Sequence, residues 1–257
     1  MDSDATDPNF MESLARGLRV LGLFEQHEEL TVAQISKLSG LSRSSANRCV
    51  YTLERLGYIV AVAGGFGLSP AMLPLSAAFL TSNPLAGAAQ PVVNAIRDEI
   101  GESSSLAMLD TRSNLERIMY ICRAETVRII SVPLSVGSTL PSYCSSIGRV
   151  LLAAQEDDAL DRFLAQGAFP QRTPKTITDP AALRAEIGRV REQGWAMSDE
   201  ELERGLRSLA VPVRDRSGRT VAALNVGAQT RSKSAEALLD VALPQLLAGA
   251  AHLARLG

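Results

Sequence analysis

Histidine, cysteine and aromatic residues are scarce in this sequence, and their scarcity narrows the kinds of site it can build. There are two histidines, three cysteines and 4% aromatic residues among 257 positions. His27 and His252 lie near opposite ends of the chain, which argues against a histidine-based zinc site and leaves only a carboxylate site open. The cysteines are far apart and form no C-x-x-C motif, so we expect reduced, structural thiols. The sequence therefore predicts neither a bound metal nor a cofactor.

Long apolar runs and a large excess of one charge are also missing. Each apolar run is interrupted well before the roughly 20 residues that a membrane span needs. The first seven residues are acidic, whereas a secretory signal is basic and then apolar. With 46% hydrophobic residues, 21% charged residues and a net charge of −2, the composition is that of a soluble globular protein. We expect a cytoplasmic protein with no membrane partner.

Local signals in the N-terminal region predict short helices joined by a tight turn. Apolar residues recur at helical spacing over residues 10–24, which predicts a first amphipathic helix. Thr31 and Gln34 have the spacing of a capping box at the start of a second helix. Gly40 tolerates the left-handed conformation that ends a helix, and Ser42 then caps a third one. This arrangement is a helix-turn-helix pattern.

The third helix has two contrasting faces and is followed by a hairpin. At about 100° per residue, one face is mostly apolar and holds Ala46, Cys49, Val50, Leu53 and Leu56. The opposite face carries hydrogen-bonding groups and no carboxylate, namely Ser44, Asn47, Arg48, Tyr51 and Arg55, with Arg43 at its flank. Two short β-rich segments then surround Gly64 and Gly65, which is the layout of a wing.

Together these features predict a domain that binds double-stranded DNA. Residues 31–69 carry four basic side chains and one acidic side chain, a local charge of +3. Asn47 and Arg48 suit base edges, whereas Arg43 and Arg55 suit phosphates. The candidate DNA-binding residues are Thr31, Arg43, Ser44, Ser45, Asn47, Arg48, Tyr51, Arg55, Gly64 and Gly65. One recognition helix reads only a half-site, so we expect a homodimer, or a dimer of dimers, on a near-palindromic operator.

The rest of the chain predicts a second domain of mixed composition. Segments rich in Val, Ile and Leu predict strands at residues 106–110, 117–123, 127–132, 209–214 and 220–227. Helical patterns cover residues 85–102, 145–166, 180–193 and 233–256. Strands mixed with flanking helices predict an α+β sandwich. We expect a DNA-binding domain over residues 1–69, a linker helix over 70–84, and a ligand-binding domain over 85–257.

Four segments carry a family resemblance over nearly the whole chain. They are residues 10–18 (FMESLARGL), 41–48 (LSRSSANR), 148–153 (GRVLLA) and 199–213 (DEELERGLRSLAVPV). In these segments the sequence resembles the IclR-type bacterial transcriptional regulators. The resemblance implies an N-terminal all-α winged helix-turn-helix plus a C-terminal α+β GAF-like effector-binding domain. Residues 10–18 and 133–146 look most similar to the branch that controls aromatic-acid breakdown through the β-ketoadipate pathway.

The resemblance also implies where a small acid would bind. The implied effector residues are Ile129, Val132, Tyr143, Ser146, Ile147, Ser198, Asp199, Ser208, Asn225 and Gly227. Backbone amides at the helix start near Ser145 suit a carboxylate, and the apolar members suit an aromatic body. Relatives that bind small oxo-acids have hydroxyl residues at the positions of Asn225 and Gly227, which favours a larger aromatic or dicarboxylic acid here. A regulator that senses glyoxylate or pyruvate is the alternative.

Two other classes of function are alternatives to a ligand-responsive regulator. Cys144 has no histidine beside it to act as a base, and the G-x-S-x-G and phosphate-loop motifs are missing, so we expect no enzyme. The second alternative is a helical domain that docks on another protein. The partners expected of a regulator are DNA, a small organic acid and a second copy of the chain, with RNA polymerase as a further candidate.

Overall fold

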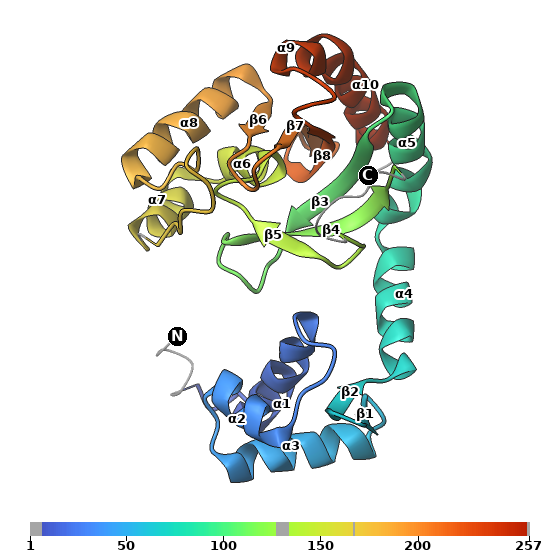
Figure 1. Cartoon of the computed structure of the whole chain (residues 1–257), viewed down its shortest axis with the longest axis vertical. Coiled ribbons are helices and arrows are strands. Elements are labelled where there is room, and N and C mark those ends of the chain that lie inside the picture. The colour runs from blue at the N-terminus through green and yellow to red at the C-terminus, as the bar shows by residue number, and fades with distance from the viewer. Residues whose placement is uncertain (1–6, 127–133, 167, 256–257) are drawn as a thin grey trace. The chain divides into compact units, whose positions relative to one another are not determined.

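The computed structural model describes residues 7–126, 134–166 and 168–255 of the chain (Figure 1). The chain divides into two units, Met1–Phe79 and Leu80–Gly257. The division falls within α4 (Leu73–Ser82), a helix inside the segment predicted as a linker. Each unit has its own buried apolar cluster, so the two are described separately.

The N-terminal unit contains the predicted helices and hairpin. Its elements are α1 (Glu12–Gly22), the 3-10 turn η2 (Leu23–Glu25), α2 (Val32–Ser39), α3 (Arg43–Arg55), β1 (Ile59–Val62) and β2 (Gly65–Leu68). Strands β1 and β2 pair antiparallel. The core of this unit is formed by Val20, Phe24, Leu30, Ile35, Ala46, Val50, Leu53 and Ile59. The predicted winged helix-turn-helix is therefore confirmed.

The caps that the sequence predicts define the helix-turn-helix. The Thr31 hydroxyl accepts a hydrogen bond from the Gln34 amide at 3.3 Å, and the Gln34 side chain accepts one from the Thr31 amide at 2.8 Å. Gly40 ends α2 in the left-handed conformation, at φ 71°. Ser42 caps α3 through the Ser45 amide at 3.2 Å. Because these capping signals involve residues only a few positions apart, they can be recognised from the sequence alone.

Two glycines in the chain are required by close approach. A Cβ on Gly65 would lie 2.5 Å from the carbonyl oxygen of Leu30, because the wing pairs with that segment through a bridge between Leu30 and Phe66. A Cβ on Gly148 would lie 2.1 Å from the carbonyl oxygen of Ser142. Only glycine allows the backbone to pack this tightly at the wing and at the start of a helix in the second unit.

The second unit is an antiparallel sheet with helices on both faces. The strands, in the spatial order β5-β4-β3-β8-β7-β6, are β5 (Thr139–Pro141), β4 (Arg117–Ala124), β3 (Ser103–Leu109), β8 (Thr220–Gln229), β7 (Leu206–Arg214) and β6 (Ala196–Asp199). One face packs on α5 (Pro84–Ile100) and α10 (Leu243–Ala254). The other packs on α6 (Ser146–Ala153), α7 (Asp157–Ala165) and α8 (Pro180–Gln193) (Figure 1). The predicted α+β class is confirmed.

Several predicted boundaries were wrong. Residues 145–166 form two helices, α6 and α7, because the chain is extended at Glu156. The C-terminal helix is interrupted by a five-residue π turn, Leu238–Ala242, directly before Pro244. That proline lacks an amide hydrogen and crowds the preceding turn, which explains the wider turn there. The short strands β5 and β6 were not predicted, and the strand predicted at residues 127–132 lies outside the described residues.

The apolar C-terminal helical segment is a core element of the second unit. Residues Ala235–Ala254 are long and apolar enough for a membrane span by length and composition alone. Leu238, Leu246 and Leu253 from this segment are fully buried in the cluster that α5 and the sheet form. The core helix of a soluble protein passes the same test.

Candidate functional sites

The outer face of α3 is exposed, as the wheel of apolar and polar residues predicts. Ala46, Val50 and Leu53 are buried, whereas the side carrying Asn47 and Tyr51 faces solvent, with Tyr51 60% exposed. Also exposed are Arg43, Ser44, Arg48 and Arg55. One prediction for the apolar side was wrong, because Leu56 is 64% exposed. The accessible face thus presents three guanidinium groups and an amide on one helix.

The remaining candidate DNA-binding residues have local partners or neighbours. Thr31 is engaged in its capping box, and the Ser45 hydroxyl accepts a hydrogen bond from Ser42 at 3.0 Å. A Cβ on Gly64 would lie 2.0 Å from a carboxylate oxygen of Glu29, so an acidic side chain borders the turn of the wing. Residues 59–68 hold no charged side chain of their own. The wing can therefore offer DNA only backbone groups and apolar contacts.

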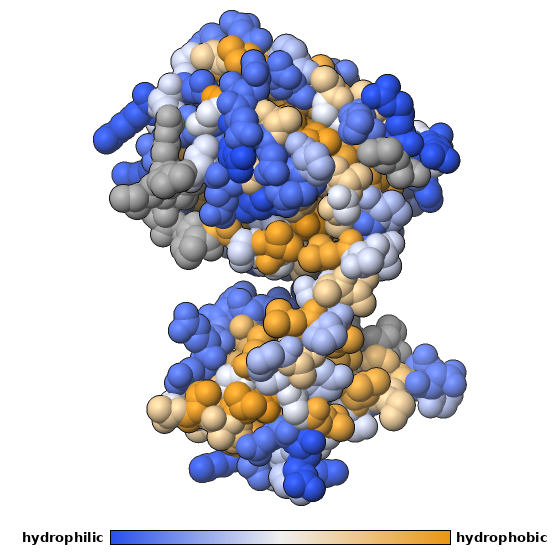
Figure 2. Space-filling model, turned by 90° about the vertical axis from the view of Figure 1, so that its right-hand side faces the viewer, coloured by the Kyte–Doolittle hydropathy of each residue, from blue (hydrophilic) through white to orange (hydrophobic). Residues whose placement is uncertain are grey.

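An apolar groove of about 840 Å³ lies between α1 and α3 in the same unit. Its walls include Met11, Leu14 and Leu18 from α1 and its N-terminal flank, which are 64%, 55% and 58% exposed. Leu56 and Leu75, 64% and 57% exposed, complete the apolar wall. We call the groove with this lining the α1 groove. Figure 2 shows that apolar side chains also lie on the face of the N-terminal unit that is seen there.

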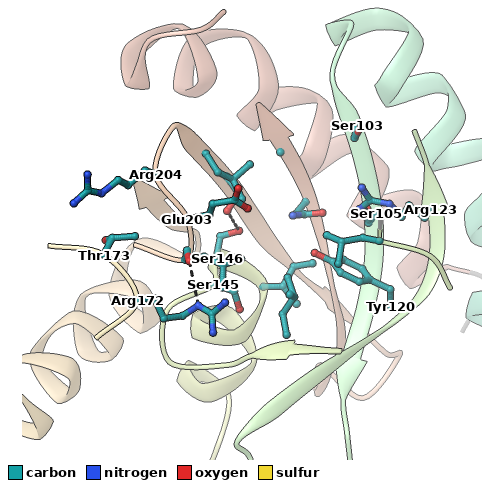
Figure 3. Close-up of a pocket in the computed structure, with 18 of the residues that line it drawn as sticks. Ser103, Ser105, Tyr120, Arg123, Ser145, Ser146, Arg172, Thr173, Glu203 and Arg204 are labelled. Atoms are coloured by element: carbon teal, nitrogen blue, oxygen red, sulfur yellow. Dashed lines mark hydrogen bonds between the residues drawn. The ribbon is translucent and has the colours of Figure 1, made fainter. Parts of the chain in front are cut away.

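A second pocket, of about 680 Å³, lies in the C-terminal unit on the sheet face that α6 covers. Its floor comes from neighbouring strands in register. Ser103 lies opposite Gly227, and Gly227 lies opposite Ser208. One step along the sheet, Ser105 lies opposite both Arg123 and Asn225 (Figure 3). We call this space the sheet pocket.

The start of α6 forms one wall of the sheet pocket. Ser145 caps the helix, since its hydroxyl accepts a hydrogen bond from the Gly148 amide at 3.2 Å. The Ser146 hydroxyl donates to the Ser208 hydroxyl at 2.8 Å, which ties the helix start to β7. The amides at the first turn of a helix lack partners within the helix and carry its positive end, so they attract an anion.

Three arginines and one carboxylate, Glu203, line the sheet pocket. Figure 3 shows Arg123 on one side and Arg172 and Arg204 on the other. The Arg123 side chain is 9% exposed, and its guanidinium lies 5.4 Å from the centre of the Tyr120 ring. Burial raises the pKa of Tyr120 to about 12, so its hydroxyl is a hydrogen-bond donor at neutral pH. The pocket suits an anionic ligand with an apolar body.

The structure brings five of the ten predicted effector residues into the sheet pocket. These are Ser146, Ile147, Ser208, Asn225 and Gly227. Ile129 and Val132 lie outside the described residues. The role of each in binding remains a prediction.

The other three predicted effector residues are not among the residues lining the sheet pocket. The Tyr143 hydroxyl donates to the carbonyl of Pro170, and its ring packs 5.4 Å from that of Phe169, measured between centroids. The Ser198 hydroxyl donates to the carbonyl of Cys144 at 2.9 Å. Asp199 pairs with Lys175 and Arg207. The role of these three residues in binding also remains a prediction.

Several pocket residues were missed by the sequence prediction. They are Ser103, Ser105, Tyr120, Arg123, Arg172, Thr173 and Arg204. Serines are uncommon in central strands, so the strand was predicted to begin at residue 106 although β3 begins at Ser103. Two serines at alternate positions share a strand face, and that spacing was the signal available for Ser103 and Ser105.

The surroundings of Cys144, the candidate nucleophile, make its thiol unreactive. Cys144 is fully buried, and this burial raises the pKa of its thiol to about 11. A thiol of that pKa is protonated at neutral pH and is a weak nucleophile. Among the residues that the structure describes, no three His, Cys, Asp or Glu side chains gather as metal ligands would.

Comparison with known proteins identifies the family. Residues 13–63 match the IclR helix-turn-helix domain, and residues 77–255 match the C-terminal domain described as "Bacterial transcriptional regulator IclR C-terminal". The chain therefore belongs to the IclR family of bacterial transcriptional regulators. Its members are DNA-binding regulators, and the chain is a regulator rather than an enzyme.

Individual relatives agree with this assignment over most of the chain. The chain is 45% identical to the Pca regulon regulatory protein of Pseudomonas putida, covering 92% of this chain and 82% of the relative. It is 30% identical to the p-hydroxybenzoate hydroxylase transcriptional activator of Acinetobacter baylyi, covering 93% and 89%. A solved IclR homologue from Microbacterium hydrocarbonoxydans, in complex with 4-hydroxybenzoate, is 25% identical with a TM-score of 0.78, covering 95% and 100%.

Proposed function

We propose that this protein regulates genes of aromatic-acid catabolism in response to a small aromatic or dicarboxylic acid bound in the sheet pocket. The observation that carries the proposal is the pocket itself, which combines a helix start, flanking guanidinium groups and apolar walls. The names of two relatives point the same way, since one is the p-hydroxybenzoate hydroxylase transcriptional activator and another is a homologue in complex with 4-hydroxybenzoate. The protein acts in the bacterial cytoplasm, where its operator lies.

In this proposal the exposed face of α3 enters the major groove of the operator. Arg48 and Asn47 contact base edges, because guanidinium and amide groups match the donor and acceptor pattern of G and A there. Arg43 and Arg55 lie toward the ends of the helix and contact phosphates. The exposure of these four side chains supports the assignment. The wing, which lacks charge, contributes backbone contacts only.

Two copies of the chain act together on DNA. A single α3 reads a half-site, so recognition of a near-palindrome needs a dimer. The α1 groove supports this proposal, because exposed leucines of this number on one surface usually mark an interface. The acid then shifts the population of dimer conformations that fit the operator.

One combined experiment tests the proposed function. Purified protein is footprinted on the promoter upstream of its own gene, and its melting temperature is measured with a panel of aromatic, dicarboxylic and oxo-acids. We expect protection of a near-palindromic site and stabilisation by an aromatic or dicarboxylic acid, since a ligand that binds only the folded state raises its stability. A shift with glyoxylate or pyruvate alone would instead support the oxo-acid alternative. Turnover of an acid, or no footprint at low salt, would overturn the proposal.

A further inference from the structure

The floor of the sheet pocket carries a row of polar side chains across three adjacent strands. Ser105 of β3 lies opposite Arg123 of β4 and opposite Asn225 of β8. Asn225 is buried, at 7% exposed, and the Arg123 side chain is 9% exposed. Central strands covered by helices on both faces normally bury apolar side chains. We call Arg123, Ser105 and Asn225 the polar row.

Asn225 is the member of the row whose hydrogen bonding is incomplete. Its Oδ1 is enclosed and receives no hydrogen bond from any residue that the structure describes. An unsatisfied buried acceptor costs about 1–3 kcal/mol, so native proteins retain few of them and usually for a reason. The neighbouring Ser105 hydroxyl accepts a hydrogen bond from Arg123 at 2.9 Å, and among the described residues no hydrogen bond joins it to Asn225 Oδ1. A ligand that brings a hydrogen-bond donor to this oxygen would complete Asn225.

The placement of Arg123 is not explained by its ion pair. Its partner Glu125 is 58% exposed, and an ion pair of that kind adds little stability. A register shift of β4 against β3 instead brings Arg123 and Tyr120 onto the same face, since Leu106 lies opposite Cys122 whereas Ala107 lies opposite Tyr120. The guanidinium is thus held over the floor of the pocket, between Ser105 and the Tyr120 ring.

The row lies apart from the other polar groups of the pocket. Figure 3 shows Arg123 and Ser105 on one side, with Ser145, Ser146 and Arg172 displaced from them toward the other. The pocket therefore has two polar ends, one at the start of α6 and one at the row. A ligand that satisfies both must carry an oxygen function at each end.

We propose that the polar row is a specificity site for a hydroxyl at the far end of the acid, because Asn225 Oδ1 needs a donor and a carboxylate only accepts hydrogen bonds. This inference rests on the proposed function, in which the carboxylate takes the amides at the start of α6. The hydroxyl accepts a hydrogen bond from Arg123 and donates one to Asn225 Oδ1. An acid without that hydroxyl fills the pocket but leaves Asn225 unsatisfied.

One matched pair of acids tests the inference on the full-length protein. Benzoate is compared with 4-hydroxybenzoate by calorimetric titration. We expect 4-hydroxybenzoate to bind about tenfold more tightly, as a buried hydrogen bond to a charged group would give.

Variants assign the preference to the row. Asn225→Leu and Arg123→Met should each bring the affinity ratio of the two acids to within twofold of one. Glu125→Gln is the matched control, because it removes the ion pair of Arg123 without altering the pocket lining. If either variant melts far below the wild type, Ser105→Ala gives the same comparison with a smaller change.

Each outcome bears on the inference. Equal affinities for benzoate and 4-hydroxybenzoate, or a preference that survives in Asn225→Leu and Arg123→Met, overturn the specificity site and leave the proposed function intact. Loss of the preference in Glu125→Gln as well shows that the ion pair, not the pocket, positions the ligand, which also overturns it. Failure of both acids to bind overturns this inference, and the wider panel of acids then decides the proposed function.

Discussion

Among single residues, Gly227 controls the space in the sheet pocket most directly. A Cβ added there would meet no atom within 4 Å, and the residue has an ordinary strand conformation. Gly227→Val should therefore fold normally, and with slightly higher stability because glycine weakens a strand by about 0.5–1 kcal/mol. Its side chain would occupy the ligand's space and weaken acid binding at least about tenfold, measured by titration. Gly188→Ala in α8, also in open space, is the control. Unchanged ligand affinity in Gly227→Val would exclude this part of the pocket.

Arg48 is the residue on which base recognition depends most in our proposal. Arg48→Ala should cost roughly 1–3 kcal/mol of specific operator binding, the usual worth of a bidentate contact to guanine. Gel-shift titrations on the operator and on an unrelated duplex separate this loss from a general loss of charge. Arg19→Ala on α1 removes the same charge outside α3 and serves as the control. Equal losses for both variants on both duplexes would show that Arg48 contributes charge only.

For helices and strands, the sequence predicted features that depend on neighbouring residues and missed features that depend on residues distant in the sequence. The capping box at Thr31 and the glycine stop at Gly40 depend on neighbours within four residues, so the sequence predicted them correctly. The polar row depends on register between β3, β4 and β8, which are distant in sequence, and its members Ser105 and Arg123 were missed. The break between α6 and α7 was also missed, because Glu156 offers no strong stop signal.

The hairpin between β7 and β8 illustrates a local signal with a measurable pH dependence. Asp215 accepts hydrogen bonds from the Ser217 hydroxyl at 2.6 Å and from the Arg219 amide at 3.0 Å. The Ser217 bond is the largest cause that lowers the pKa of Asp215 to about 2. A lowered pKa stabilises the folded protein above the unfolded value near 4, and that stability is lost as the pH falls toward 2.

Asp215→Asn tests this dependence. The variant should melt at a lower temperature than wild type at pH 7, and the difference should shrink as the pH falls from about 4 to 2, since both proteins are then uncharged at this position. Thermal melts across pH 2–7 measure it. A difference that stays constant down to about pH 2 would mean that the loss comes from the changed shape of the turn, not from the charge of Asp215.

For the whole molecule, the sequence predicted two domains of the correct classes, and family resemblance supplied their functions. The periodicity of α1 shows that one face of this helix is apolar, but not which surface covers it. Met11, Leu14 and Leu18 are exposed in the single chain, although such a stripe is normally buried. We therefore expect the exposed apolar stripe of α1 to be covered in the assembled regulator.

Leu18→Glu tests whether the α1 groove is the contact between two copies. A charge introduced there should convert dimers to monomers in light scattering at micromolar concentration, and operator binding should fall while acid binding stays unchanged. Leu38→Glu on α2, 48% exposed and outside the groove, should leave the oligomeric state unchanged. Dimers of unaltered stability in Leu18→Glu would exclude the groove as the contact.

The uncharged wing sets a limit on how steeply operator affinity responds to ionic strength. In residues 59–68 no side chain can displace a cation from a phosphate, so the exposed arginines of α3 carry this effect. Arg43 and Arg55, which we place on phosphates, would release about four condensed ions from two copies, which gives a slope of about −4 for the logarithm of affinity against the logarithm of salt concentration. The complex of this protein with its operator should consequently persist at salt concentrations that dissociate regulators whose wings are rich in lysine.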